Sequence, residues 1–347
     1  MKKTISTLLT MAMLLMLALT GCGGGNSNAG DSDGNGAQAS GGDDKAYTAS
    51  LSTPIPETNI VASEIKNFVD LVAERTEGRV QITPFYNNVL GNQKDMFTAL
   101  SNNEQELILD GSITDYYATE YGFLFAPFFI RNADHLQAIL DGDLFAQVKD
   151  SLGESSIAVL GEAIRGSRVT YSTIEMASAE DISKLVIRMP DLSSYITAWS
   201  TLGASTQIMG GADVYSALST GVVNSCEGPY SQGVSDKYAE VTGYLYPTNH
   251  VTEPYFIYAS QKWLDSLPED LAKIVADTAA EVMDNVTNTC AADADQSRQA
   301  LLDAGMTYMD NVDFSGLFEK VRPIYEEKFA SGEWASSYDE VMSYYKQ

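Results

Sequence analysis

The stretch from residue 181 to residue 230 constrains the fold of this chain more than any other segment. It begins with a short apolar strand that carries Arg188 and is halted by Pro190, and it continues through two helices, separated by a Gly-Ala-Ser turn, to a second apolar strand at Gly221 to Val223. Two strands connected by helices in this order predict a βαβ arrangement. In such units the carboxyl ends of the strands meet at a cleft, so the surroundings of Arg188 are expected to form a binding site.

Arg188 is hard to explain as a structural residue, because a charge on a buried strand requires a partner. A guanidinium group presents a planar pair of donors that matches a carboxylate, and it keeps its charge when water is excluded. Arg188 is therefore predicted to bind the carboxylate of a small ligand. A structural ion pair is the alternative interpretation.

The segment from residue 47 onward alternates between strand and helix patterns. Strands are predicted at Tyr47 to Ser52, Val80 to Pro84 and Leu107 to Asp110, with helices between them. This alternation predicts an α/β fold with a mostly parallel sheet. The 301 residues from 47 to 347 favour two lobes over one simple core.

The later part of the chain predicts a strand and an unusually long helix. A run of aromatic and β-branched residues follows Pro254, which is typical of a strand. Pro268 then opens an amphipathic pattern that reaches Leu302, about 35 residues or roughly 50 Å of helix, long enough to brace both lobes. Aromatic-rich terminal helices are expected between residues 314 and 345.

The N-terminus predicts export and lipid attachment. The apolar run from Leu8 to Leu19 is shorter than the about 20 residues that a membrane span needs, so residues 1–21 are interpreted as a signal peptide. The sequence Leu-Thr-Gly-Cys at its end resembles the bacterial lipoprotein cleavage box, which makes Cys22 the lipid-bearing residue. Residues 22–46 are rich in Gly, Asn, Ser and Asp and are predicted to be a flexible tether.

The acidic composition excludes several classes of partner. The net charge is −26, and removal of residues 1–21 leaves 19 basic residues against 47 acidic ones, a net charge of −28. Nucleic acid is thereby excluded as a natural partner, and broad adhesion to anionic lipid headgroups is disfavoured. An anion can still be bound, because the Debye length in physiological salt is about 8 Å and a buried arginine acts locally.

Motifs for catalysis, cofactors and metals are weak. The two histidines, His135 and His250, have neither zinc-ligand nor triad spacing, and the glycines form no dinucleotide fingerprint. Cys226 and Cys290 are expected to be free thiols, although a disulfide between them stays open. We therefore expect no enzyme, no cofactor and no metal. A surface-anchored enzyme acting through Cys226 and a structural surface lipoprotein are the alternatives.

The blocks IRMP, LGAS and DVYSALSTGVVNSCEGP together resemble the solute-binding proteins of TRAP transporters. ERTEGRVQITPFYNNVLG, FLFAPFFI and YFIYASQKWLDSLPEDL extend this resemblance over roughly residues 47 to 330. It implies a two-lobed fold like that of periplasmic binding proteins, with residues 47–165 and 254–290 in lobe I and residues 166–253 and 291–347 in lobe II. It also implies an extracytoplasmic receptor that captures an organic acid for the small and large membrane subunits of a TRAP transporter.

The resemblance assigns ligand contacts as well. Arg188 falls on the family's characteristic carboxylate-binding arginine, and Arg168 matches a second arginine, with Arg165 as a competitor for that role. Strand ends of lobe I add short polar residues as further contacts. The complete set of predicted ligand-binding residues is Arg188, Arg168, Glu227, Met209, Gly211, Tyr230, Ser52, Thr53, Gly111 and Ser112.

Two departures from the family pattern bear on the ligand. Gly228 stands where the family often has an asparagine that helps hold the carboxylate, and Gly211 stands where some members place an aromatic residue over the ligand. The loss of bulk at Gly211 is expected to enlarge the pocket or to admit another aromatic side chain. Larger monocarboxylates, sugar acids and aromatic acids thus compete with C4-dicarboxylates as ligands.

Overall fold

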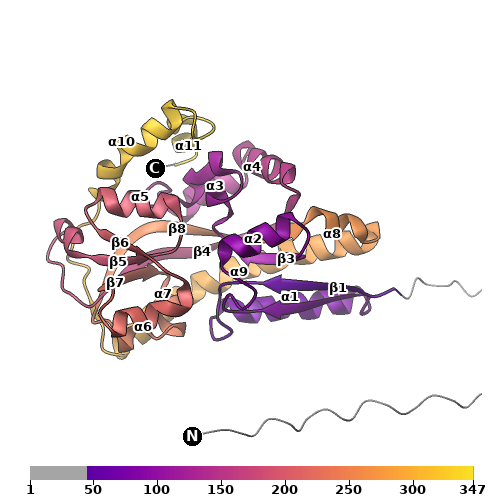
Figure 1. Ribbon diagram of the computed structural model, residues 1–347, viewed down its shortest axis with the longest axis horizontal. Coiled ribbons are helices and arrows are strands. Elements are labelled where there is room, and N and C mark those ends of the chain that lie inside the picture. The colour runs from indigo at the N-terminus through magenta and orange to yellow at the C-terminus, as the bar shows by residue number, and fades with distance from the viewer. Residues whose placement is uncertain (1–44, 347) are drawn as a thin grey trace, which may run out of the picture. The chain divides into compact units, whose positions relative to one another are not determined.

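One nine-stranded mixed sheet organises residues 45–346, the part of the chain that the computed structural model describes (Figure 1). Its order is β2-β1-β3-β8-β4-β7-β5-β6, with β9 paired to β8 outside this path. The strands are β1 (Tyr47–Ser52), β2 (Val80–Phe85), β3 (Leu107–Asp110), β4 (Ile157–Ser172), β5 (Val186–Met189), β6 (Ser205–Ile208), β7 (Ser225–Gly228), β8 (Tyr244–Ser260) and β9 (Thr307–Tyr308). The predicted signal peptide and Cys22 lie outside the described residues.

The sheet is parallel only in its outer parts. The pairs β1/β2, β1/β3, β5/β6 and β5/β7 are parallel, whereas β3/β8, β8/β4 and β4/β7 are antiparallel. The prediction of an α/β fold is confirmed, and that of a mostly parallel sheet is wrong for the centre. The reason is that β4 and β8 run the length of the sheet in opposite directions, which a local strand-helix alternation does not reveal.

The predicted lobe boundaries fall within these two long strands. Gly166 of β4 pairs with Glu253 of β8, and the register shifts between Ile164 and Gly166. Gly166 has a φ of +108°, a conformation that L side chains rarely adopt. The boundaries at 165/166 and 253/254 thus lie opposite each other at an irregular point of the sheet, and the assignment of residues to the lobes stays a prediction.

Helices cover both faces of the sheet (Figure 1). One face packs against α1 (Val61–Arg75), α6 (Val214–Ser219) and the 35-residue α9 (Glu269–Asp303). The long predicted helix is thereby confirmed. Gly161 lets α9 approach β4 closely, because a Cβ at this position would lie 2.8 Å from the carbonyl oxygen of Ala279.

The opposite face carries the largest apolar core. It packs against α2 (Gln93–Ser101), α3 (Ala133–Leu140), α4 (Asp143–Glu154), α5 (Ser193–Thr201), α10 (Leu317–Ala330) and α11 (Tyr338–Ser343). Phe123 and Phe129 meet Phe329 and Trp334 there at centroid distances of 5.6 to 6.0 Å. These rings attach the terminal helices to the central layer, as expected for an aromatic-rich C-terminal segment. No helix among residues 45–346 is long and apolar enough to cross a bilayer.

The βαβ block is present but differs at its end. β5, α5 and β6 follow in order, and β6 is an edge strand of polar residues that the sequence pattern did not indicate. The strand expected at Gly221 to Val223 is instead the turn after α6, because Gly221 has a φ of +74° and the amide of Val222 caps the helix by donating to Ala217. The strand itself is β7, whose polar residues are buried by their neighbours.

Candidate ligand-binding site

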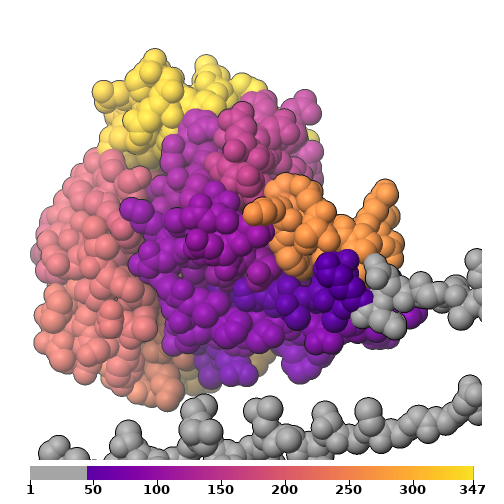
Figure 2. Space-filling view, turned by 45° about the vertical axis from the view of Figure 1, so that its right-hand side comes forward, coloured from indigo at the N-terminus to yellow at the C-terminus, as the bar shows by residue number. Residues whose placement is uncertain are grey.

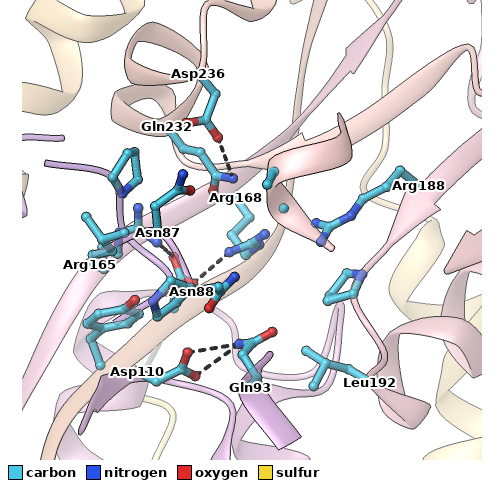
Figure 3. A pocket seen from close by; sticks show the side chains of 18 of the residues that line it. Asn87, Asn88, Gln93, Asp110, Arg165, Arg168, Arg188, Leu192, Gln232 and Asp236 are labelled. Carbon is cyan, nitrogen blue, oxygen red and sulfur yellow. Dashed lines mark hydrogen bonds and ion pairs between the residues drawn. The ribbon is translucent and has the colours of Figure 1, made fainter. Parts of the chain in front are cut away.

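A cavity of about 280 Å³ lies between the loops that follow β1 and β2 on one side and β5, α5 and α7 (Tyr230–Ser235) on the other (Figure 3). Figure 2 shows the surfaces of these two parts, purple and salmon, meeting along a seam. The lining residues are Pro54, Ile55, Pro56, Asn87, Asn88, Gln93, Asp110, Phe125, Arg165, Arg168, Arg188, Pro190, Leu192, Tyr195, Gly211, Ala212, Tyr215, Gln232, Asp236, Tyr238, Glu253 and Tyr255.

Arg188 reaches into this cavity from the end of β5 (Figure 3). Its Nε and Nη2 donate to the carbonyl oxygen of Met209 over 3.0 and 2.8 Å, which fixes the guanidinium. Within the part of the chain that the structure describes, no carboxylate forms an ion pair with it, although only 6% of the residue is exposed. A buried cation with unused donors in a cavity is suited to bind an anion.

Arg168, by contrast, is already occupied by two protein carboxylates. Its Nε and Nη2 lie 2.5 and 2.9 Å from the two carboxylate oxygens of Glu227, and its Nη1 lies 2.6 Å from Glu253 Oε1. This bidentate pair and the additional ion pair are buried. Arg168 lines the cavity, but most of its hydrogen-bonding capacity serves the protein.

Glu227 is held from its other side by His250. The imidazole Nε2 lies 3.0 Å from Glu227 Oε2, and Nδ1 lies 2.9 Å from the hydroxyl of Thr248. Burial lowers the pKa of His250 despite the neighbouring carboxylate, so the neutral ring donates to Glu227 and accepts from Thr248. Burial alone would raise the pKa of Glu227, but the charge of Arg168 and the bond to His250 outweigh it and hold this pKa well below its usual range.

Arg165 makes the fewest hydrogen bonds of the three buried arginines, although it has a carboxylate partner. Its Nη1 is 3.4 Å from Glu253 Oε2, its guanidinium lies 5.1 Å from the ring centroid of Tyr255, and its Nε has no acceptor among the described residues. Arg165 and Arg168 both line the cavity and compete for the role of second ligand-binding arginine. Arg165 has more N–H donors without an acceptor than Arg168 has, so the structure favours Arg165 for that role.

A buried carboxyl group marks the far side of the cavity from Arg188 (Figure 3). Asp110, at the end of β3, accepts from Gln93 Nε2 over 2.9 Å and from the backbone and hydroxyl of Ser112 over 2.7 and 2.6 Å. Burial raises the pKa of Asp110 above its ordinary value, and the hydrogen bonds from Ser112 and Gln93 offset part of that effect. No basic side chain of the described chain pairs with it, so the group remains an acceptor for a ligand.

A second polar group comes from α7 and the residues that follow it. Gln232 Nε2 donates to Asp236 over 3.2 Å, and the hydroxyl of Tyr238 donates to the same Asp236 oxygen over 3.1 Å. Burial raises the pKa of Asp236, with these two bonds acting in the opposite direction.

Gly211, in the 3₁₀ turn η4 (Gly211–Asp213), has open space where a side chain would lie.

The structure brings only some of the predicted residues to the cavity. Arg188, Arg168 and Gly211 line it, Met209 contributes through its carbonyl, and Glu227 lies behind Arg168. Tyr230 lines a different cavity beside Cys290, and both Cys226 and Cys290 are free and buried. Ser52, Thr53, Gly111 and Ser112 are buried next to lining residues and are not themselves among them.

Sequence reasoning missed most of the polar lining. Asn87, Asn88, Gln93, Gln232 and Asp236 all reach the cavity. The strand-end rule applied to β1 and β3 also indicates the two asparagines, because they come two and three residues after the end of β2. Gln232 and Asp236 lie on and after a short helix and carry no comparable signal.

The chain belongs to the family described as bacterial extracellular solute-binding protein, family 7, which matches residues 51–332. A solute-binding protein of Roseobacter denitrificans is 23% identical over 76% of this chain and 85% of its own length. The 2,3-diketo-L-gulonate-binding periplasmic protein of Escherichia coli is 26% identical, with 72% and 76% covered. The C4-dicarboxylate-binding periplasmic protein of Rhodobacter capsulatus is 23% identical, with 75% and 77% covered.

Solved structures confirm the two-lobed fold implied by the sequence resemblance. A TRAP periplasmic solute-binding protein of Polaromonas, bound to D-erythronate, has a TM-score of 0.80 at 20% identity and covers 86% of this chain and 99% of its own. The corresponding protein of Chromohalobacter salexigens, with bound D-glucuronate, also has a TM-score of 0.80, at 23% identity, with 86% and 100% covered.

Proposed function

We propose that this protein is a receptor that binds a small organic carboxylate in the cavity and delivers it to the membrane subunits of a TRAP transporter. The observation that carries this proposal is Arg188, a buried guanidinium whose acceptor among the described residues is one main-chain carbonyl. A ligand carboxylate would supply the missing counter-charge through two charge-assisted hydrogen bonds. Closure of two lobes over the ligand would then be favoured by the contacts made in the closed state.

A sugar acid with one carboxylate fits the site better than a dicarboxylate. Asp110 and Asp236 line the cavity without an ion pair to any described basic side chain, although the charge of Arg165 acts on Asp236, and each would accept hydrogen bonds from ligand hydroxyls. A second ligand carboxylate near Asp110 would meet like charge in a low-dielectric site, which disfavours it. The bound D-erythronate and D-glucuronate of the structural relatives support the same chemical class.

The proposed location is the outer side of the cell membrane. Cys22, preceded by the signal-like run and followed by the polar segment to residue 46, is proposed to carry the lipid. The receptor would then stay close to its transporter while its cavity samples the surrounding solution.

A thermal-shift screen tests the receptor assignment. D-glucuronate, D-erythronate and L-galactonate are compared with succinate, since ligand at 100 times its dissociation constant adds about 2.7 kcal/mol to stability. We expect stabilisation by at least one sugar acid, weaker stabilisation by succinate, and recovery of the acid unchanged. Absence of stabilisation by every carboxylate would contradict the receptor proposal, and chemical turnover would favour an enzyme instead.

A further inference from the structure

Gly228 and Gln232 form a matched pair beside the cavity. Gly228 ends β7, and Gln232 follows one turn later on α7. A Cβ at position 228 would lie 2.7 Å from Gln232 Oε1 and 3.1 Å from its Cδ. These distances are shorter than Cβ contacts allow, so the amide of Gln232 occupies the space that a side chain at position 228 would need.

The backbone does not require glycine at this position. Gly228 is absent from the glycines with positive φ, and it pairs with Val169 in regular antiparallel register. An alanine could therefore adopt the same backbone conformation, and the only atoms in its way belong to the end of the flexible Gln232 side chain. The absence of a side chain at position 228 thus leaves the space that the amide of Gln232 occupies.

The hydrogen bonds of Gln232 use one end of its amide and leave the other end without a partner. Nε2 donates to Asp236 Oδ2 over 3.2 Å and to the Tyr238 hydroxyl over 3.3 Å, which uses both of its hydrogens. Oε1 accepts no hydrogen bond from any described residue. Figure 3 shows the side chain reaching from α7 toward the cavity that Gln232 lines.

We propose that Gly228 and Gln232 act as one specificity-determining unit, in which the missing side chain at position 228 holds Gln232 Oε1 in place to accept a hydrogen bond from a hydroxyl of the bound acid. Gly228 is the positioning residue, and Gln232 makes the contact. The inference rests on the proposed carboxylate receptor and adds the group that recognises the hydroxylated part of its ligand. Asp236 and Tyr238 orient the amide by accepting its two N–H groups.

A double-mutant cycle tests the coupling. Calorimetry with D-glucuronate compares wild type, Gly228→Ala, Gln232→Ala and the double variant, and Gly316→Ala serves as a glycine-to-alanine control outside the cavity with open space for its Cβ. Loss of one neutral hydrogen bond should weaken binding about five-fold in each single variant. The double variant should bind no more weakly than Gln232→Ala, because the alanine at position 228 acts only by displacing Gln232.

The outcomes separate this inference from the proposed function. Wild-type affinity in Gly228→Ala, or additive losses in the double variant, would overturn the coupling while leaving the receptor intact. A crystal structure of Gly228→Ala with Gln232 in its original position would do the same. If the wild type binds succinate but none of D-glucuronate, D-erythronate and L-galactonate, this inference is overturned and the receptor proposal stands. If it binds no carboxylate of the screen, the proposed function is overturned and this inference with it.

Discussion

At the scale of residues, three buried arginines at one cavity differ in what neutralises them. Arg168 has two protein carboxylates, Arg165 has a long contact to one, and Arg188 has a carbonyl oxygen. A charge taken out of water must be compensated. Protein carboxylates compensate Arg168, whereas the counter-charge of Arg188 is proposed to come from a ligand carboxylate.

Arg188→Ala should abolish tight binding without unfolding the protein. Removal of one partner of a buried charge pair costs about 3 to 5 kcal/mol, which corresponds to roughly a hundred-fold to a few thousand-fold loss of affinity. Arg188→Lys keeps the charge but loses the planar pair of donors, so it should also bind poorly. Calorimetry with the best acid from the screen measures the loss, with circular dichroism as a check on folding.

Arg168→Ala is the matched contrast. It leaves Glu227 and Glu253 buried without their main partner, so the ligand-free protein should lose about 3 to 5 kcal/mol of stability, whereas Arg188→Ala should lose far less. For Arg188→Ala, the contradicting outcome is a folded variant whose affinity lies within about three-fold of the wild type, a free-energy difference of less than about 0.7 kcal/mol. Arg188 would then be a structural residue, and the proposal that it binds the ligand carboxylate would be wrong.

Gly211→Phe should narrow the choice of ligand. Gly211 lines the cavity, and nothing lies within 4 Å of the position its Cβ would take. A phenyl ring there should leave room for small acids, while bulky acids lose affinity through overlap that costs about 1 to 3 kcal/mol. Affinities across a size series from D-erythronate to D-glucuronate measure the effect. An unchanged ranking would place residue 211 away from the ligand.

The sequence indicates those cavity residues that lie in a recognisable motif or at the end of a strand. The place of Arg188 at the cavity is predictable, because Arg188 lies two residues before a proline on a buried strand inside a recognisable block. Asp110 was placed at a strand end but passed over for Gly111 and Ser112, which lie one and two residues further along. Gln232 could not be predicted, because its role depends on the space at Gly228, and that space exists only in three dimensions.

At the scale of elements, periodic segments were predictable and short polar ones were not. The long helix α9 has an apolar face maintained over 35 residues, so its pattern is unambiguous. The four-residue strands β6 and β7 carry Ser, Thr, Gln and Glu, and their strand character comes from pairing with β5 and β4. Burial by neighbours, rather than local composition, decides such strands.

Gly161→Ala should destabilise the contact between α9 and β4. The added Cβ would lie 2.8 Å from the carbonyl oxygen of Ala279 and 3.0 Å from Met283 Cγ, and the helix backbone cannot yield as a side chain can. Overpacking of this kind costs about 1 to 3 kcal/mol. Denaturant unfolding measures it, with Gly153→Ala as the control because a Cβ there meets nothing within 4 Å. Equal stability of the two variants would show that α9 shifts freely along the sheet.

At the scale of the whole molecule, a strongly acidic protein buries three arginines at one cavity. The net charge of −28 predicted for the processed chain repels anions at long range, but screening limits that field to about 8 Å in physiological salt. Arg165, Arg168 and Arg188 are each at most 7% exposed, so they act only on a ligand that has entered the cavity. Low ionic strength should therefore slow the association of an acid more than it changes the contacts of the bound state.

Cys22→Ser should release the receptor from the membrane. The anchor is inferred from residues outside the described structure, where a Leu-Thr-Gly-Cys sequence precedes a polar segment that reaches residue 46. One acyl chain holds a protein only marginally, whereas two hold it stably, so loss of the acylated cysteine removes the attachment. We expect the variant in the soluble fraction or retained as an unprocessed precursor, with its affinity for the acid unchanged once purified. Fractionation and the mass of the mature chain measure this. Membrane retention and processing equal to those of the wild type would refute lipid attachment at Cys22, while the cavity and its arginines would be unaffected.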